Sequence, residues 1–320
     1  MGFFIGATMK EHFLLHQLFN QPHLVLPDML HEAVAWAGRR MGVQLNQVNV
    51  SLPAMSAAAE PRAEVAQVPS AAGGSGVAVI GVYGVLVPRS ANVALCARQA
   101  SYEALRTALN EAVADAGVQH IVFDFDSPGG AVTGCFELAA DIRAARDIKP
   151  ITAIVHYSAF SAAYLLASAC TEIVLSQTSG VGSVGVIMKH ADFSQQLAND
   201  GVAVTTFYRG ARKNDLAPEA PLSEDAVAVV DQRMDFYYGL FAGAVTEYRG
   251  LKPEDVRATE AGLYYGADAV KAGLADRVEP QQQAINRIAA EVAAGRSKTT
   301  PAPRRRMVAQ ALAMSMATQL

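Results

Sequence analysis

Residues 118–176 read VQHIVFDFDSPGGAVTGCFELAADIRAARDIKPITAIVHYSAFSAAYLLASACTEIVLS, and this stretch decides the fold. Apolar runs typical of buried strands lie at 118–126, 151–157 and 172–176, and helical patterns lie between them. Strands and helices that alternate over short connections are typical of βαβ units on a mainly parallel sheet. The stretch therefore predicts an α/β protein.

The flanking sequence extends the same pattern. A β-rich run at 76–87 and a helical pattern at 101–116 precede the stretch. After it we expect a strand at 202–208 (VAVTTFY), a long amphipathic helix at 222–250 and a short helix at 267–273.

The ends of the chain differ from this central part. Residues 1–50 are expected to form a helical N-terminal region, in which Pro27 and Asp28 begin an amphipathic helix. Residues 51–75 are rich in Ala, Pro, Ser and Gly, and we interpret them as a flexible linker. The main domain is expected at 76–280, followed by a helical or disordered tail at 281–320.

Composition and charge exclude several classes of protein. The 320 residues are 51% hydrophobic and 18% charged, which is typical of a globular chain. A net charge of -4 gives no hint of a nucleic-acid partner. Three unevenly spaced cysteines indicate no disulfide framework, so a reducing compartment is expected. The run 151–170 contains His156 and several serines and is a poor membrane span, so we expect a soluble, cytoplasmic protein without membrane attachment.

Familiar cofactor motifs are absent from the sequence. It contains no GxxxxGK[ST] phosphate loop, and its glycine cluster at 73–76 precedes a strand instead of following one. The segment HEAVA at 31–35 lacks the second histidine of a zinc protease helix, and no serine lies in a GxSxG elbow. We therefore expect neither a cofactor nor a metal.

Four segments at the edges of the predicted sheet carry possible chemistry, and each also has a structural interpretation. They are the strand-to-helix turn DSPGG at 126–130, Ser161 at a helix start, the turn GSVG at 182–185, and the basic loop GARKND at 210–215. Bare glycine amides and an exposed hydroxyl at a helix N-terminus suit an oxyanion and a nucleophile. An ordinary turn, an N-cap serine and a solvated loop are the alternatives.

The order of these four segments resembles that of the signal peptide peptidase A family, and most of all its phage branch, the lambda-type head maturation proteases. The resemblance covers roughly 76–280, with further likeness in the N-terminal region. It implies a Ser-Lys peptidase on the crotonase/Clp-protease-like fold, a repeated ββα superhelix, here with a helical N-terminal extension. Residues 76–280 would then be the peptidase domain.

Carried over by position, the resemblance implies a role for six residues. They are the nucleophile Ser161, the general base Lys213, the lysine-orienting Ser183, the oxyanion-hole amides of Gly130 and Ala162, and Gly129 in the substrate-binding loop. The family often has Gly-Gly or Ala-Gly after the nucleophile, where this chain has Ala162-Ala163, which narrows the space. A serine hydroxyl needs an adjacent base, so we expect Lys213 to be desolvated when the site is assembled.

Alternatives remain for both the base and the function. His156 is the rival base, five residues before Ser161, and Lys189 is the other plausible lysine. The resemblance implies a homo-oligomer that cuts capsid scaffold, portal protein or its own chain in the host cytoplasm or procapsid interior. The other readings are a general cytoplasmic peptide-degrading enzyme, a crotonase-like acyl-CoA enzyme and an inactive structural protein of the capsid.

Overall fold

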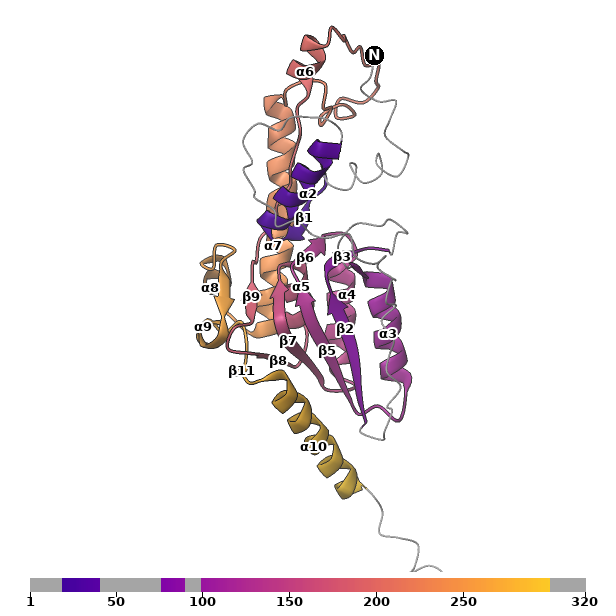
Figure 1. Ribbon diagram of the computed structural model, residues 1–320, viewed down its shortest axis with the longest axis vertical. Helices are drawn as coiled ribbons and strands as arrows, with labels where there is room; N and C mark the ends of the chain where they lie inside the picture. Colours follow the sequence, from indigo (N-terminus) through magenta and orange to yellow (C-terminus); the bar gives the residue numbers. More distant parts are fainter. Residues whose placement is uncertain (1–18, 41–75, 90–98, 300–320) are drawn as a thin grey trace, which may run out of the picture.

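The main sheet has seven strands and is mostly parallel (Figure 1). The computed structural model describes residues 19–40, 76–89 and 99–299. Strand order in the sheet is β10-β9-β7-β5-β2, with β8 beside β7 and β11 beside β8, and only β10 runs antiparallel to its neighbour. These strands are β2 (Val77–Tyr83), β5 (His120–Ser127), β7 (Ile151–Phe160), β8 (Glu172–Leu175), β9 (Gly180–Gly182), β10 (Leu263–Tyr265) and β11 (Arg277–Val278). The expected α/β class with a parallel sheet is confirmed.

A second, four-stranded sheet has the order β1-β6-β3-β4. Its strands are β1 (His23–Val25), β3 (Val85–Val87), β4 (Gln99–Ser101) and β6 (Gly129–Ala131). Because β3 follows β2 and β6 follows β5 almost at once, this small sheet lies at the carboxyl ends of two main strands. It therefore brings the N-terminal strand β1 to the edge where the candidate site residues were expected.

Helices cover both faces of the main sheet (Figure 1). The helices of the described chain are α2 (Pro27–Arg40), α3 (Tyr102–Ala114), α4 (Cys135–Ala145), α5 (Ala162–Ser168), α6 (Ser194–Asn199), α7 (Glu224–Arg249), α8 (Pro253–Arg257), α9 (Gly266–Lys271) and α10 (Gln281–Thr299). Of these, α2 and α6 lie beyond one end of the sheet (Figure 1). Side chains alternate across a strand. In β5, Phe123 and Phe125 belong to the large core with α3, α4 and α5, whereas Val122 packs on the opposite face with Ala284 and Ile288 of α10.

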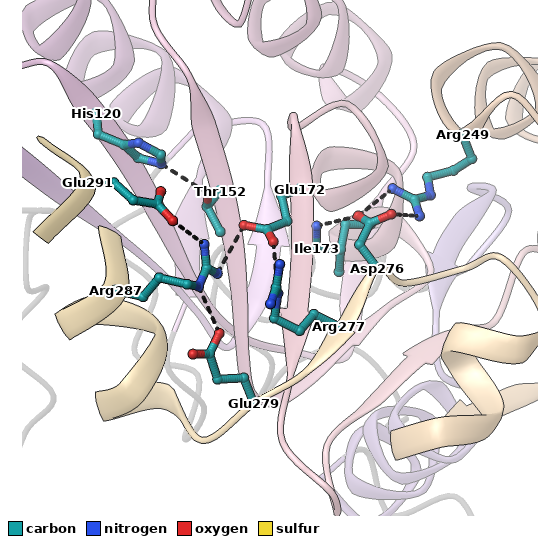
Figure 2. Close-up of polar contacts among 10 residues, drawn as sticks. All are labelled: His120, Thr152, Glu172, Ile173, Arg249, Asp276, Arg277, Glu279, Arg287 and Glu291. Carbon is teal, nitrogen blue, oxygen red and sulfur yellow. Dashed lines mark hydrogen bonds and ion pairs between the residues drawn. The ribbon is translucent and has the colours of Figure 1, made fainter. Parts of the chain in front are cut away.

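Ion pairs hold α10 to the sheet (Figure 2). Arg287 of α10 binds Glu172 at the start of β8 and Glu279 just before the helix, both at 3.1 Å. Arg277 of β11 binds Glu172 as well, at 3.2 Å. The Arg287 side chain is 22% exposed, so water screens these pairs less than it screens fully exposed ones. Part of the segment expected as a helical or disordered tail is therefore a helix that packs on the sheet.

Three local expectations need correction. The turn at 126–130 contains the start of strand β6, because Gly129 and Gly130 pair with β1 and β3. The N-terminal region expected to be helical contributes strand β1 directly before α2, whose expected start at Pro27 is confirmed. Residues 202–208, expected as a strand, form none and lie exposed, since no neighbouring strand of the described chain offers them an edge. The interpretation of 51–75 as a linker lies outside the described residues.

Candidate active site

Ser161 occupies a strained junction between a buried strand and a buried helix. It follows the last residue of β7 and precedes the first residue of α5, with φ 54° and ψ -115°. Its backbone is fixed on both sides, because its N–H donates to the Gly182 carbonyl at 2.8 Å and its carbonyl accepts from the Leu165 N–H at 2.9 Å. A residue other than glycine at positive φ costs free energy, and such strain concentrates at functional sites.

The Ser161 hydroxyl is sealed and unpaired. The residue is 1% exposed, and its Oγ has no hydrogen-bond partner among the described residues. Leaving a buried polar group unpaired costs about 1–3 kcal/mol. A structural N-cap serine would use its hydroxyl on the helix, but Ser161 makes no side-chain cap hydrogen bond to α5. Ser161 therefore holds the N-cap position of α5, but its hydroxyl does not cap the helix.

Ser183 lies beside Ser161 on the neighbouring strand end. Strands β7 and β9 run parallel with Phe160 opposite Gly182, so the residues that follow them emerge at the same edge. Ser183 also has a positive φ, 55°, and is 5% exposed. Its backbone is held by the Gly262 carbonyl, which accepts its N–H at 2.9 Å. The structure thus brings two serines with positive φ to the same edge of the sheet.

Gly129 and Gly130 pass so close to neighbouring backbone that no other residue fits. Gly129 has φ 100°, and a β-carbon there would overlap the Leu24 carbonyl and lie 2.9 Å from the Phe160 carbonyl oxygen and 3.1 Å from the Ala162 amide nitrogen. A β-carbon on Gly130 would overlap the Leu86 carbonyl. The first N–H groups of a helix have no acceptor within it. The amide of Ala162, the first residue of α5, and the glycine strand therefore converge next to Ser161.

Ser127, which no sequence argument singled out, shapes this glycine strand. It is fully buried, and its Oγ accepts the Gly129 N–H at 3.2 Å and donates to the Gly84 carbonyl at 2.7 Å. The hydroxyl thereby ties the start of β6 to the turn between β2 and β3. The only signal in the sequence was its place next to Pro128 and two glycines, and that pattern is shared by ordinary turns.

Lys213 is not a hydrogen-bond partner of Ser161. It is exposed in a loop at 210–215 that, together with residues 226–233 of α7, lines an open hollow of about 360 Å³. Figure 1 shows this half of α7 extending beyond the sheet, with α6 beside its end. The buried half of α7 that joins the core includes Phe241, and the path from Val229 to Phe241 along a helix is roughly 18 Å. No hydrogen bond joins Lys213 to Ser161 within one chain.

His156, the rival base, is far from the Ser161 hydroxyl. His156 is in β7, five residues before Ser161, and a strand rises about 3.3 Å per residue, which puts it roughly 16 Å away. Its ring stacks on Tyr157 with the centroids 4.1 Å apart. In one chain His156 therefore does not reach the Ser161 hydroxyl.

A buried thiol near the site is not a competing nucleophile. The Cys135 Sγ lies 3.6 Å from the Ala162 carbonyl oxygen, and burial raises the pKa of this thiol to about 12. The thiolate is the reactive form of cysteine. Cys135 is therefore unreactive at neutral pH, which leaves Ser161 as the nucleophile candidate in this part of the site.

Comparison with known proteins shows which family this part of the chain resembles. Residues 143–295, which include Ser161, Ser183 and Lys213, match peptidase family S49. The chain carries a peptidase family S49 domain. The strand β6 glycines precede the matched residues, and α10 lies largely within them.

Two phage proteins are similar to this chain beyond the S49 domain. "Head-tail preconnector protein GP5" of Enterobacteria phage P21 is 34% identical over 84% of this chain and 55% of its own length. "Capsid assembly protease C" of Escherichia phage lambda is 37% identical over 66% of this chain and 48% of its own length. The chain thus spans about half the length of each. "Putative signal peptide peptidase SppA" of Enterococcus faecium is 24% identical over 66% of this chain and 62% of its own length.

Within the ranges that the structure describes, no helix is both long and apolar enough to cross a membrane.

Proposed function

We propose that this protein is a serine endopeptidase with Ser161 as nucleophile and Lys213 as general base, acting on capsid proteins during phage or prophage head assembly. The observation that carries the proposal is the Ser161 hydroxyl, which is strained, buried and unpaired beside bare glycine backbone and the Ala162 amide. The two phage relatives, named for head-tail connection and capsid assembly, supply the choice of substrates. Scaffold, portal and the chain itself are the candidate substrates, in the host cytoplasm or the procapsid interior.

The chemistry is acyl transfer in two steps. Ser161 Oγ attacks the carbonyl carbon of the scissile peptide bond while its proton moves to the Lys213 amine. The oxyanion accepts hydrogen bonds from the Gly130 and Ala162 amides, each contributing about 3 kcal/mol, judged from deletion of single donors in other enzymes. Lys213 then gives the proton to the leaving amine, and water hydrolyses the acyl-enzyme. Ser183 orients the lysine by accepting a hydrogen bond from it.

Lys213 reaches the nucleophile from a second copy of the chain in this proposal. The lysine loop follows exposed apolar residues, among them Phe207 at 88% and Val204 at 52% exposure. Exposed apolar residues that cluster on one segment mark interaction sites. A second copy that covers this segment would bury Lys213, and burial disfavours the ammonium form, as a general base requires. The protein is therefore proposed as a homo-oligomer on the repeated ββα superhelical fold, with residues 76–280 as its peptidase domain.

The test follows cleavage by intact mass spectrometry. Wild type, Ser161→Ala and Lys213→Ala are each incubated with a capsid scaffold protein at assembly concentrations. Both variants should lose activity by about four orders of magnitude or more, because removing one member of a catalytic unit costs nearly as much rate as removing all of them. Lys189→Ala is the matched control and should cut as wild type does. Activity that survives Lys213→Ala but not His156→Ala would overturn the lysine assignment.

A second function is favoured by the third relative. The likeness to a putative signal peptide peptidase fits a general peptide-degrading enzyme with the same site residues. Cleavage of unfolded peptides of many sequences, at rates equal to those for scaffold or portal protein, would favour this second function.

A further inference from the structure

The N-terminal strand β1 lies where a peptide substrate is expected. It pairs antiparallel with β6, the glycine strand of the site, in the register His23 to Ala131, Leu24 to Gly130 and Val25 to Gly129. Its other edge is filled as well, because His23 and Ile187 exchange N–H to carbonyl hydrogen bonds of 2.8 and 2.9 Å. An extended segment held between two backbone edges is how many enzymes and binding domains take a peptide.

The register of β1 puts one particular carbonyl at the proposed oxyanion hole. The Leu26 N–H donates to the Pro128 carbonyl at 3.0 Å. In an antiparallel ladder, hydrogen-bonded pairs recur at every second residue, so the Leu24–Gly130 pair is the next hydrogen-bonded one, with the Gly130 N–H opposite the Leu24 carbonyl. A β-carbon on Gly129 would overlap the same carbonyl, and it would lie 3.1 Å from the Ala162 amide nitrogen. The Leu24 carbonyl thus lies opposite the amide of one proposed oxyanion donor, Gly130, and both it and the Ala162 amide are neighbours of Gly129.

The segment that precedes β1 extends toward the lysine loop. Asn20 receives and makes three hydrogen bonds there: its N–H donates to the Lys189 carbonyl at 2.9 Å, its Nδ2 donates to the Leu216 carbonyl at 3.2 Å, and its Oδ1 lies 2.9 Å from His190 Nδ1. Leu24 is fully buried and Val25 is 8% exposed. Residues 20–26, with β1 at their centre, therefore run from Leu216, next to the lysine loop, to the glycine strand β6.

We infer that residues 20–26 occupy the substrate groove of their own chain in the orientation of a substrate, with the Leu24 carbonyl in the oxyanion hole, and so hold the single chain in a blocked state. The inference rests on the proposed peptidase function. It explains why the Ser161 hydroxyl is inaccessible although its neighbours are arranged for catalysis. A substrate strand has to displace β1, and the side chain of Leu24 marks an apolar subsite for the residue before the cut.

One test measures access to residue 161 without any enzymatic activity. In a Ser161→Cys background, iodoacetamide labelling of residue 161 is followed by peptide mass spectrometry, which separates it from the three native cysteines. Leu24→Asp forces a charge into an apolar site and should release β1, raising the labelling rate about tenfold or more. Asn20→Ala, a milder change, should raise it less, and His31→Asp on the exposed side of α2 should not change it. Equal labelling in all four proteins would overturn the inference.

A second test locks the strand in place. His23 and Ala131 form a non-hydrogen-bonded pair, with α-carbons about 4.5 Å apart, within the range that a disulfide spans. The His23→Cys, Ala131→Cys protein should cleave scaffold protein only after reduction, whereas wild type should be insensitive to reductant. Equal cleavage by the oxidised and reduced forms would overturn the blocked state. Slow labelling at residue 161 that the disulfide slows further, with no cleavage by any form, would uphold the covered groove and overturn the peptidase function instead.

Discussion

The two proposed catalytic residues lie in regions of opposite character. Ser161 is buried. Its backbone is hydrogen-bonded on both sides, and its hydroxyl and the neighbouring glycines are enclosed by packed strands and helices. Lys213 sits in an exposed loop beside the half of α7 that leaves the sheet. On the proposed assignment, one chain therefore encloses the nucleophile and the oxyanion donors and leaves the base exposed. If the assignment holds, a folded single chain does not yet have a complete catalytic site.

The largest expected effect comes from mixing two inactive variants. Ser161→Ala and Lys213→Ala are each inactive alone, but when the subunits are exchanged, some sites combine an intact Ser161 with an intact Lys213 from the neighbour. Random mixing in a symmetric oligomer should restore about a quarter of wild-type activity. Peptide cleavage after co-refolding measures it. No recovery, with mixed oligomers present by native mass spectrometry, would place both residues of the pair in one chain.

The glycine strand beside Ser161 should not tolerate a side chain. Gly129→Ala would force positive φ on an alanine and overlap the position of the Leu24 carbonyl, which is also the proposed position of the substrate carbonyl. We expect kcat/KM to fall by about 10²–10³, the cost of losing one oxyanion interaction. Gly201→Ala is a matched control, since Gly201 also has positive φ, 69°, but has open space around it. Similar losses in both variants would indicate backbone strain alone.

Substitution of two phenylalanines should distinguish the stability of the single chain from its self-association. Phe241 of α7 is fully buried against the core, so Phe241→Ala should lower the free energy of unfolding by about 3–5 kcal/mol. Phe207 near the lysine loop is 88% exposed, and Phe207→Ala should change the free energy of unfolding of the single chain by less than about 0.5 kcal/mol. Urea unfolding measures both. Sedimentation should show weaker self-association for Phe207→Ala, and unchanged association would contradict its place in a subunit contact.

The smallest expected effect concerns the C-terminal end of α7, which packs on the core. There Arg249 binds Asp276 at 2.7 Å (Figure 2). Burial raises the pKa of this carboxyl, but hydrogen bonds from Arg249 and the Ile173 N–H outweigh burial and hold it below its usual value. The pair therefore stabilises the fold above the unfolded pKa of about 3.9, and this contribution disappears as the pH falls through the lower folded pKa.

Asp276→Asn tests this pair directly. It should cost about 1 kcal/mol at pH 6, allowing for solvent screening at a side chain that is 38% exposed, and progressively less toward pH 2. Urea unfolding of both proteins across this range checks it. A cost that stays constant down to pH 2 would show that the charge of Asp276 contributes nothing.

The sequence predicted the sheet well because its strands are continuous apolar runs that need no distant information. Ser161, Ser183 and the two glycines came together as expected, since parallel strands end at one edge. β1 was missed because three residues, His23–Val25, carry no periodicity, and their strand conformation depends on β6, more than 100 residues later. For residues 202–208 the prediction of a strand was wrong. Their composition favours a strand, but a strand forms only where another strand offers its backbone for pairing.

The exposed position of the Lys213 loop has a consequence for when the protein acts. If every working site needs two chains, the number of sites rises with roughly the square of chain concentration while the copies are dilute. A freshly made, scattered population would then be quiet, and the same molecules would become active where copies are gathered, as in a closed shell. The activity of such a protein would follow the local concentration of its own copies, and no separate inhibitor protein would be needed elsewhere.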